Sequence, residues 1–153
     1  MSILTDLKTI KLFADLKEPV LKKIETITET ETFKKGDPLF KENQYADYFY
    51  AVIEGKVALE LGINSSRLCR IKDVLPGEVF GISSLVDTDM RTYIANATAV
   101  EKSKVFRWKG SHLEKLFFED YELGFFFMRN VGKILKNRLQ YTRAQLAADL
   151  HLT

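Results

Sequence analysis

The residues best suited to chemistry lie in one short stretch, 77–92, which reads GEVFGISSLVDTDMRT. Gly81 has no Cβ and allows a close approach of the backbone, and a turn of helix beginning there would present unpaired amide N–H groups. Ser83 and Thr92 can supply hydroxyl donors, and the Arg91 guanidinium can neutralise an anion through two hydrogen bonds. The stretch therefore predicts a receptacle for a small anion.

A purely structural interpretation of the same stretch stays open. An arginine near a serine-rich turn is usually a solvated surface group or part of an ion pair. Asp87 and Asp89 are close enough in sequence to be partners of Arg91.

The composition excludes several other kinds of chemistry. The chain has 153 residues, which predicts one domain over 1–153, and its net charge of +2 is too small to imply nucleic-acid binding. A single cysteine, Cys69, cannot form an internal disulfide, and His112 and His151 lie too far apart in sequence for a metal site. We expect no metal, no cofactor and no catalytic nucleophile or acid–base pair, and hence no enzyme.

The N-terminal segment 1–10, MSILTDLKTI, is charged and lacks the apolar centre of a signal peptide. No apolar run approaches the roughly 18 residues that a membrane span needs. These observations predict a cytoplasmic protein that does not bind a membrane.

The spacing of apolar residues divides the chain into three parts. Residues 11–28 have helical periodicity, and Pro19 suits the start of a second helix. From residue 30 to 108, short runs rich in Phe, Tyr, Val and Ile are broken by turn residues, which predicts six to eight strands, among them 67–74, 92–100 and 103–108. Residues 111–150 are helical again. The order of elements predicts an α+β domain, with helices over 1–28, a β core over 29–109 and helices over 111–150.

The C-terminal part is predicted to hold a short helix and then a long one, from about residue 121 to 149. Residues 111–114 have the pattern of a capping box, and Gly124 and Gly132 suggest close packing. The aromatic run 125–127 is expected to pack on the β core. The apolar seam of the long helix predicts a homodimer; its residues are Phe127, Val131, Leu135, Leu139, Thr142 and Leu146.

Several ordered segments together resemble the cyclic nucleotide-binding domain. Residues 36–57, GDPLFKENQYADYFYAVIEGKV, are similar to the front half of that domain. Residues 76–81, PGEVFG, resemble the start of the family's phosphate-binding cassette, and Arg91-Thr92 resembles its end. Asn43 stands where the family usually has glycine, which predicts a positive φ. The resemblance covers roughly 13–145, and its specificity lies in the ordered set rather than in one motif.

The resemblance implies an eight-stranded antiparallel β jelly roll, or double-stranded β-helix, with N-terminal helices and a long C-terminal helix. That helix would close over the ligand and form the dimer. The implied phosphate-side residues are Gly81, Ile82, Ser83, Ser84, Leu85, Arg91 and Thr92, the base-side residues are Thr142 and Arg143, and the dimer seam is Val131, Leu135, Leu139 and Leu146.

Two departures from the family pattern set the expected affinity. Ile82 occupies the position of a glutamate that accepts hydrogen bonds from the ribose, and Tyr93 stands where the family has a small residue. Losing a hydrogen bond to a charged group costs roughly 1.5–3 kcal/mol. The sequence therefore predicts weak or absent binding of cyclic AMP and cyclic GMP, or a ligand that does not make the ribose contact.

A further departure is that no helix-turn-helix follows the long helix, although the catabolite-activator group carries one. A basic run on that helix (Arg129, Lys133, Lys136, Arg138 and Arg143) suggests DNA binding, but without a recognition helix the solvation of a dimer seam is the favoured explanation.

Three hypotheses result. The first is a regulatory module that senses a cyclic nucleotide or related phosphorylated ligand and signals through its C-terminal helix. The second is a degenerate, non-binding domain that serves as a dimerisation or interaction scaffold. The third, less favoured, is a DNA-binding transcription regulator that lacks its helix-turn-helix.

Overall fold

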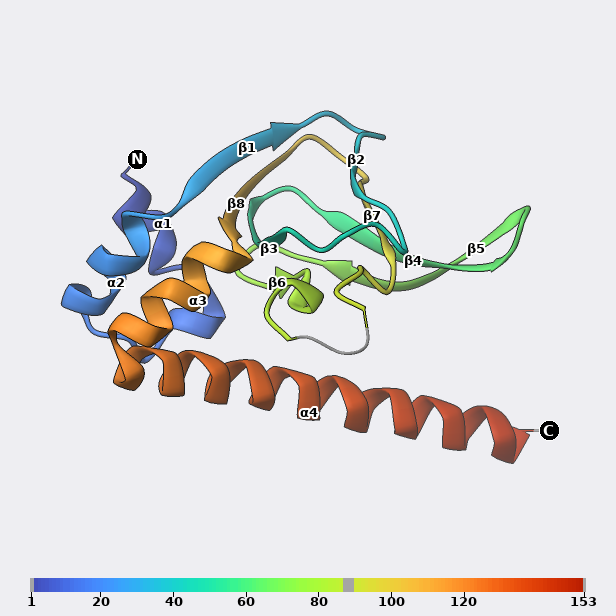
Figure 1. Cartoon of the computed structure of the whole chain (residues 1–153). Helices are drawn as coiled ribbons and strands as arrows, with labels where there is room; N and C mark the ends of the chain where they lie inside the picture. Colours follow the sequence, from blue (N-terminus) through green and yellow to red (C-terminus); the bar gives the residue numbers. More distant parts are fainter. Residues whose placement is uncertain (1, 87–89, 153) are drawn as a thin grey trace.

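Two four-stranded antiparallel sheets face each other, with helices packed against one of them (Figure 1). The structure, a computed structural model, describes residues 2–86 and 90–152. The helical elements are α1 (Ile3–Leu7), η1 (Lys11–Phe13), α2 (Glu18–Glu25), η2 (Ile82–Ser84), α3 (Gly110–Glu119) and α4 (Tyr121–Leu152). The strands are β1 (Glu29–Phe33), β2 (Pro38–Phe40), β3 (Tyr48–Glu54), β4 (Val57–Asn64), β5 (Arg67–Val74), β6 (Val79–Phe80), β7 (Asn96–Ala99) and β8 (Ser103–Lys109).

The strand order confirms the predicted eight-stranded jelly roll with flanking helices. One sheet has the order β1-β8-β3-β6 and the other β2-β7-β4-β5, so that all neighbours except the hairpin strands β4 and β5 are non-consecutive in the chain. All described pairs are antiparallel, including Ala51 opposite Phe106 and Val79 opposite Ala51. The short strand β6 is the edge of its sheet, and it leads directly into the 81–85 turn.

The alternation of side chains along β3 and β8 creates two separate cores. Phe49, Phe106 and Trp108 point to the helices and pack with Phe13 and Phe127. The Trp108 ring meets Phe13 edge to face at a centroid distance of 5.6 Å, and its Nε1 donates a hydrogen bond to Thr28 Oγ1 over 2.7 Å. On the other face, a second core fills the space between the sheets; it includes Phe40, Tyr50, Val52, Phe80, Tyr93 and Val105.

The first half of α4 is anchored in the helical core, and its second half is not. Leu123, Phe127 and Val131 are buried, and the buried Asn130 donates from Nδ2 to Leu12 O over 3.0 Å and to Asp15 Oδ1 over 2.9 Å. Residues 139–151 are all exposed, and this end of the helix projects beyond the β core, as does the β4–β5 hairpin (Figure 1).

The structure corrects several predictions for the C-terminal helices. Helix α3 begins at Gly110 with Lys109 as its N-cap and no side-chain cap, so the capping box at 111–114 is wrong. Of the run 125–127, only Phe127 packs on the core, since Phe125 and Phe126 are exposed. Gly124 does mark close packing, because an added Cβ would lie 2.8 Å from Phe117 Cβ, whereas a Cβ on Gly132 would meet no described atom within 4 Å.

Other differences are smaller. Helix α1 lies within the segment 1–28 that was expected to be helical, although no periodicity marked its bounds. The strand expected over 92–100 is reduced to β7, because the described chain just before Asn96 forms only an isolated bridge between Tyr45 and Thr92. Asn43 has φ +70°, as predicted. No helix among the described residues is long and apolar enough to cross a membrane.

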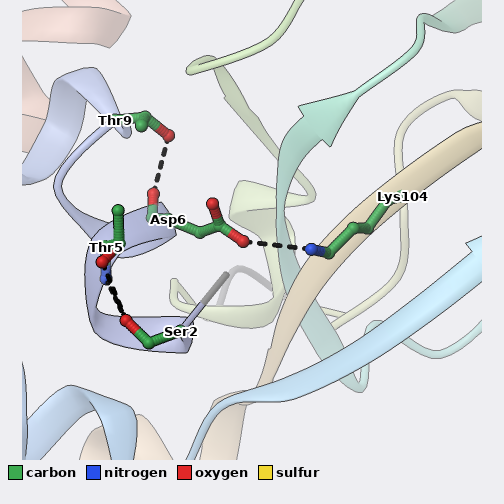
Figure 2. A network of polar contacts seen from close by, with 5 residues as sticks. All are labelled: Ser2, Thr5, Asp6, Thr9 and Lys104. Atoms are coloured by element: carbon green, nitrogen blue, oxygen red, sulfur yellow. Dashed lines mark hydrogen bonds and ion pairs between the residues drawn. The ribbon is translucent and has the colours of Figure 1, made fainter.

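An ion pair attaches the N-terminal helix to the sheet (Figure 2). Asp6 is 7% exposed, and its Oδ2 accepts a hydrogen bond from Lys104 Nζ on β8 over 3.0 Å. The same helix is capped by Ser2, whose Oγ accepts from the Thr5 amide over 3.2 Å. Because the Lys104 side chain is also only 29% exposed, removing its partner would leave a charge that water solvates poorly.

We therefore expect Asp6→Asn to lower the free energy of unfolding by about 1–2 kcal/mol. Urea denaturation followed by Trp108 fluorescence measures the change. Glu18→Gln is the matched control, because it breaks the pair with Lys8, which spans 3.6 Å between two half-exposed side chains. Equal effects of the two variants would show that the buried pair does not anchor α1.

Candidate functional site

The 81–85 turn depends on a glycine at its first position. Gly81 has φ +81° and ψ +32°, a left-handed conformation that costs other residues about 1–2 kcal/mol. A Cβ at this position would lie 2.9 Å from the Tyr48 carbonyl oxygen and 3.2 Å from the Tyr50 ring. Gly81 therefore lets the chain turn directly against β3, which is the close backbone approach that the sequence suggested.

Of the four amides that follow Gly81 in this turn, two are used internally and two are not. The Gly81 carbonyl accepts hydrogen bonds from the Ser84 amide over 3.1 Å and from Ser84 Oγ over 2.8 Å, and the Leu85 amide donates to Ile82 O over 2.9 Å. The Ile82 and Ser83 amides donate to no other described residue, and no side chain caps η2. These two N–H groups are the donors that the turn can offer to an anion.

The side chains of the turn divide between the protein interior and the surface. Ser84 is 1% exposed and packs under α3, where a Cβ on Gly110 would overlap the Ser84 carbonyl oxygen. Ile82 and Leu85 are partly buried against the helical core. Ser83 is half-buried, so its hydroxyl is the one in the turn best placed for a ligand. Ser84, in contrast, uses its hydroxyl to hold the turn together.

Tyr93 fills the space behind Gly81. It is 3% exposed, its ring stacks on Phe40 at a centroid distance of 3.6 Å, and it lies 3.6 Å from where a Gly81 Cβ would be. The Tyr93 hydroxyl donates to Tyr48 O over 2.7 Å and accepts from the Tyr48 amide over 2.9 Å. Burial raises the pKa of Tyr93, so the phenol stays neutral under physiological conditions.

Arg91 lies at the other end of the segment and faces a carboxylate. Its side chain is 18% exposed, and Nη2 lies 3.8 Å from Oε2 of Glu114 on α3. Its backbone is fixed too, because Arg91 O accepts a hydrogen bond from the Ala46 amide over 3.0 Å. Asp87 and Asp89, the partners that the sequence suggested, lie outside the described residues. The sequence assigned Glu114 to a helix cap, and it therefore gave no sign of this ion pair.

The residues predicted for the base side of the ligand and for the dimer seam all lie on α4, but they differ in burial. Thr142 and Arg143 lie on the exposed second half of the helix, away from its packed part. Leu135, Leu139 and Leu146 are 42%, 58% and 57% exposed. Val131, predicted to lie in the dimer seam, is 1% exposed and packs in the chain's own core, as does Phe127. The exposed seam therefore begins later along α4 than the sequence indicated.

A cavity of about 150 Å³ that was not predicted from the sequence opens between the two sheets. Tyr45, Asp47, Tyr48, Tyr93 and Arg107 are among its lining residues. Arg107 stacks over the Tyr48 ring at 4.1 Å, and its Nη2 pairs with Glu29 and Glu31, each over 3.2 Å. Neither this cavity nor a larger one of about 290 Å³ between α2 and α3 is lined by residues of the 81–85 turn.

A jelly roll with a glycine-initiated turn between β6 and β7, an arginine at the end of that segment and a long C-terminal helix defines a class of regulatory ligand-binding domains. Residues 30–120 match the family described as "Cyclic nucleotide-binding domain". This match spans more than half of the chain, and the protein belongs to that family.

Curated relatives include cGMP-dependent protein kinase 2 of Homo sapiens, which is 33% identical over 98 residues, or 62% of this chain and 12% of the kinase. An isozyme 2 form of the Drosophila melanogaster kinase is 29% identical over 87 residues, which are 56% of this chain and 9% of that protein. The chain thus matches only a small part of these relatives.

Solved structures extend the likeness over almost the whole chain. A putative cyclic nucleotide-binding protein from Geobacter metallireducens is 32% identical with a TM-score of 0.77, covering 91% of this chain and 99% of that one. A cyclic nucleotide-binding domain from Methylobacillus flagellatus has a TM-score of 0.82 at 20% identity, covering 96% and 82%. At that identity the second likeness shows the fold alone.

The geometry at Gly81 predicts a large cost for a single methyl group. We expect Gly81→Ala to lower the free energy of unfolding by about 3 kcal/mol, because a left-handed backbone and an overlap with Tyr48 add together. Gly36→Ala is the control, since Gly36 has φ +91° but no atom within 4 Å of an added Cβ. We expect about 1–2 kcal/mol there. Equal losses in urea denaturation would mean that the close approach to Tyr48 does not matter.

Proposed function

We propose that the protein is a regulatory module that binds a small phosphorylated ligand, such as a cyclic nucleotide, at the 81–85 turn. The observation that carries this proposal is the pair of amides at Ile82 and Ser83, which bond to no other described residue and follow a glycine in the left-handed conformation. Tyr93 lies behind the same glycine, so the segment that carries Arg91 runs beside the turn.

The chemistry of the turn favours the phosphate over the sugar. Backbone N–H groups and a guanidinium stabilise an anion. Ile82, however, brings no acceptor for a ribose hydroxyl, and its side chain packs on the helical core. A ligand held through its phosphate is therefore preferred, and unmodified cyclic AMP and cyclic GMP are expected to bind weakly.

A scaffold without a ligand is the second candidate, and two observations favour it. Tyr93 occupies the space behind the turn with both of its hydrogen bonds made to Tyr48. Glu114 already faces the Arg91 guanidinium. If the ligand cannot displace this carboxylate, the fold retains only its interaction surfaces.

The exposed half of α4 is the surface on which we place a homodimer. Leu135, Leu139 and Leu146 recur at spacings of four and seven residues on its exposed face. Gly132 precedes them on the same face and has open space around it, although glycine costs a helix about 1 kcal/mol relative to alanine. A second copy that packs its own α4 at this position would make use of both features.

Ligand binding is tested by a thermal-shift screen with cyclic AMP, cyclic GMP and cyclic dinucleotides. A ligand at a hundred times its dissociation constant stabilises the folded state by about 2.7 kcal/mol. Arg91→Ala should remove any shift, because the anion loses its counter-charge. Arg129→Ala, an exposed arginine on α4, is the control and should leave the shift unchanged.

The same screen separates the module from the scaffold. Glu114→Gln should increase the affinity by up to about fivefold, because the neutral side chain no longer competes for Arg91. A shift that survives Arg91→Ala would place the ligand elsewhere. If no probe shifts either the wild type or Glu114→Gln, the scaffold is the better description.

For the dimer, Leu139→Arg is expected to give a monomer in sedimentation at concentrations where the wild type is dimeric, because a charge cannot be buried in the seam. Gln140→Arg, next to it but on another face of α4, should leave the dimer intact. A wild type that sediments as a monomer at all accessible concentrations would refute the assignment.

A further inference from the structure

Arg138 connects the middle of α4 to the strand that leads into the 81–85 turn. Its Nη2 donates a hydrogen bond to the Val79 carbonyl oxygen over 2.7 Å. Val79 lies on β6, which is only two residues long and has a neighbouring strand, β3, on one side. The guanidinium thus supplies a donor to an edge strand two residues before Gly81.

The environment of this arginine differs from that of the other basic residues on α4. Arg129, Lys133, Lys136 and Arg143 are exposed, whereas Arg138 is half-buried. Burial lowers the pKa of Arg138, and the nearby Glu78 carboxylate partly offsets this effect. A half-buried guanidinium that bonds to a carbonyl is a specific contact, because the carbonyl compensates for the lost hydration.

The position of Arg138 along α4 marks a boundary. Before it, Phe127, Val131 and Ile134 pack against the core, and after it residues 139–151 are all exposed. The Arg138–Val79 bond is therefore the last hydrogen bond from α4 to the β core among the described residues. Whatever shifts β6 also shifts the point from which the exposed half of α4 projects.

We propose that Arg138 is the positioning residue of the 81–85 turn. Its side chain holds β6 in place and thereby links the conformation of the turn to the exposed half of α4. The proposal rests on the ligand site proposed above for its regulatory meaning, but the link itself is a property of the ligand-free chain. The coupling acts in both directions, because a contact that favours one arrangement of the turn favours the matching arrangement of the helix.

Hydrogen exchange of the full, ligand-free chain tests the link. Arg138→Met should increase the exchange rates of the Ser84 and Leu85 amides, and of amides in the helix after residue 138, by about fivefold to tenfold, because a charge-assisted bond no longer resists local opening. Lys136→Met removes the same charge from an exposed position two residues away, and it should change neither segment. Arg138→Lys keeps one donor and should restore part of the protection.

Two results would overturn the proposal: equal exchange in the Arg138→Met and Lys136→Met variants, or faster exchange in α4 with an unchanged turn.

A second experiment measures ligand binding, with the cyclic nucleotide that gives the largest thermal shift of the wild type. In this experiment, Arg138→Met should raise the dissociation constant of that nucleotide about fivefold to tenfold. The free energy of unfolding of the ligand-free protein should be nearly the same in the Arg138→Met and Lys136→Met variants. If no cyclic nucleotide binds the wild type, the proposed function fails, whereas the exchange experiment still decides the role of Arg138.

Discussion

The lack of room on either side of the 81–85 turn is the constraint on which the functional part of this protein depends. On one side, Gly81 lies against the Tyr48 carbonyl and the Tyr50 ring, at distances that leave no space for a methyl group. On the other side, Gly110, the first residue of α3, lies so close to Ser84 that an added Cβ would overlap the Ser84 carbonyl oxygen. The turn is thus held between β3 and α3. A turn fixed in this way keeps its amides oriented before any ligand arrives, and preorganised donors are the effective ones.

The helices are attached to the same turn at its two ends through charged groups. Glu114 of α3 faces Arg91, and Arg138 of α4 bonds to Val79. The two helices are themselves packed together, since Gly124 leaves no space between α4 and Phe117. The consequence is a single helical unit that contacts the chain at three places: at Val79 before the turn, at Ser84 within it and at Arg91 after it.

Much of this fold was predictable from the sequence because it depends on local rules. Strand β5 coincides with the predicted residues 67–74, and the long helix differs from its prediction by a few residues at its end. The positive φ of Asn43 was predictable because asparagine adopts this conformation more readily than most other residues with a side chain. The contacts that define the site were harder to predict, since Arg91–Glu114 and Arg138–Val79 join residues that are distant in the chain. Amphipathic periodicity also assigned Val131 to a partner, although the chain's own helices and sheet cover it.

The projecting half of α4 has a mechanical consequence. An α-helix rises about 1.5 Å per residue, so the part beyond Arg138 extends for about 20 Å. If Arg138 acts as its fulcrum, a rotation of about 10° displaces the far end by roughly 4 Å, while atoms near the fulcrum hardly move. Under the proposed link through Arg138, the length of this projecting segment would enlarge a small adjustment near Gly81 into a displacement of several ångströms at the end of α4.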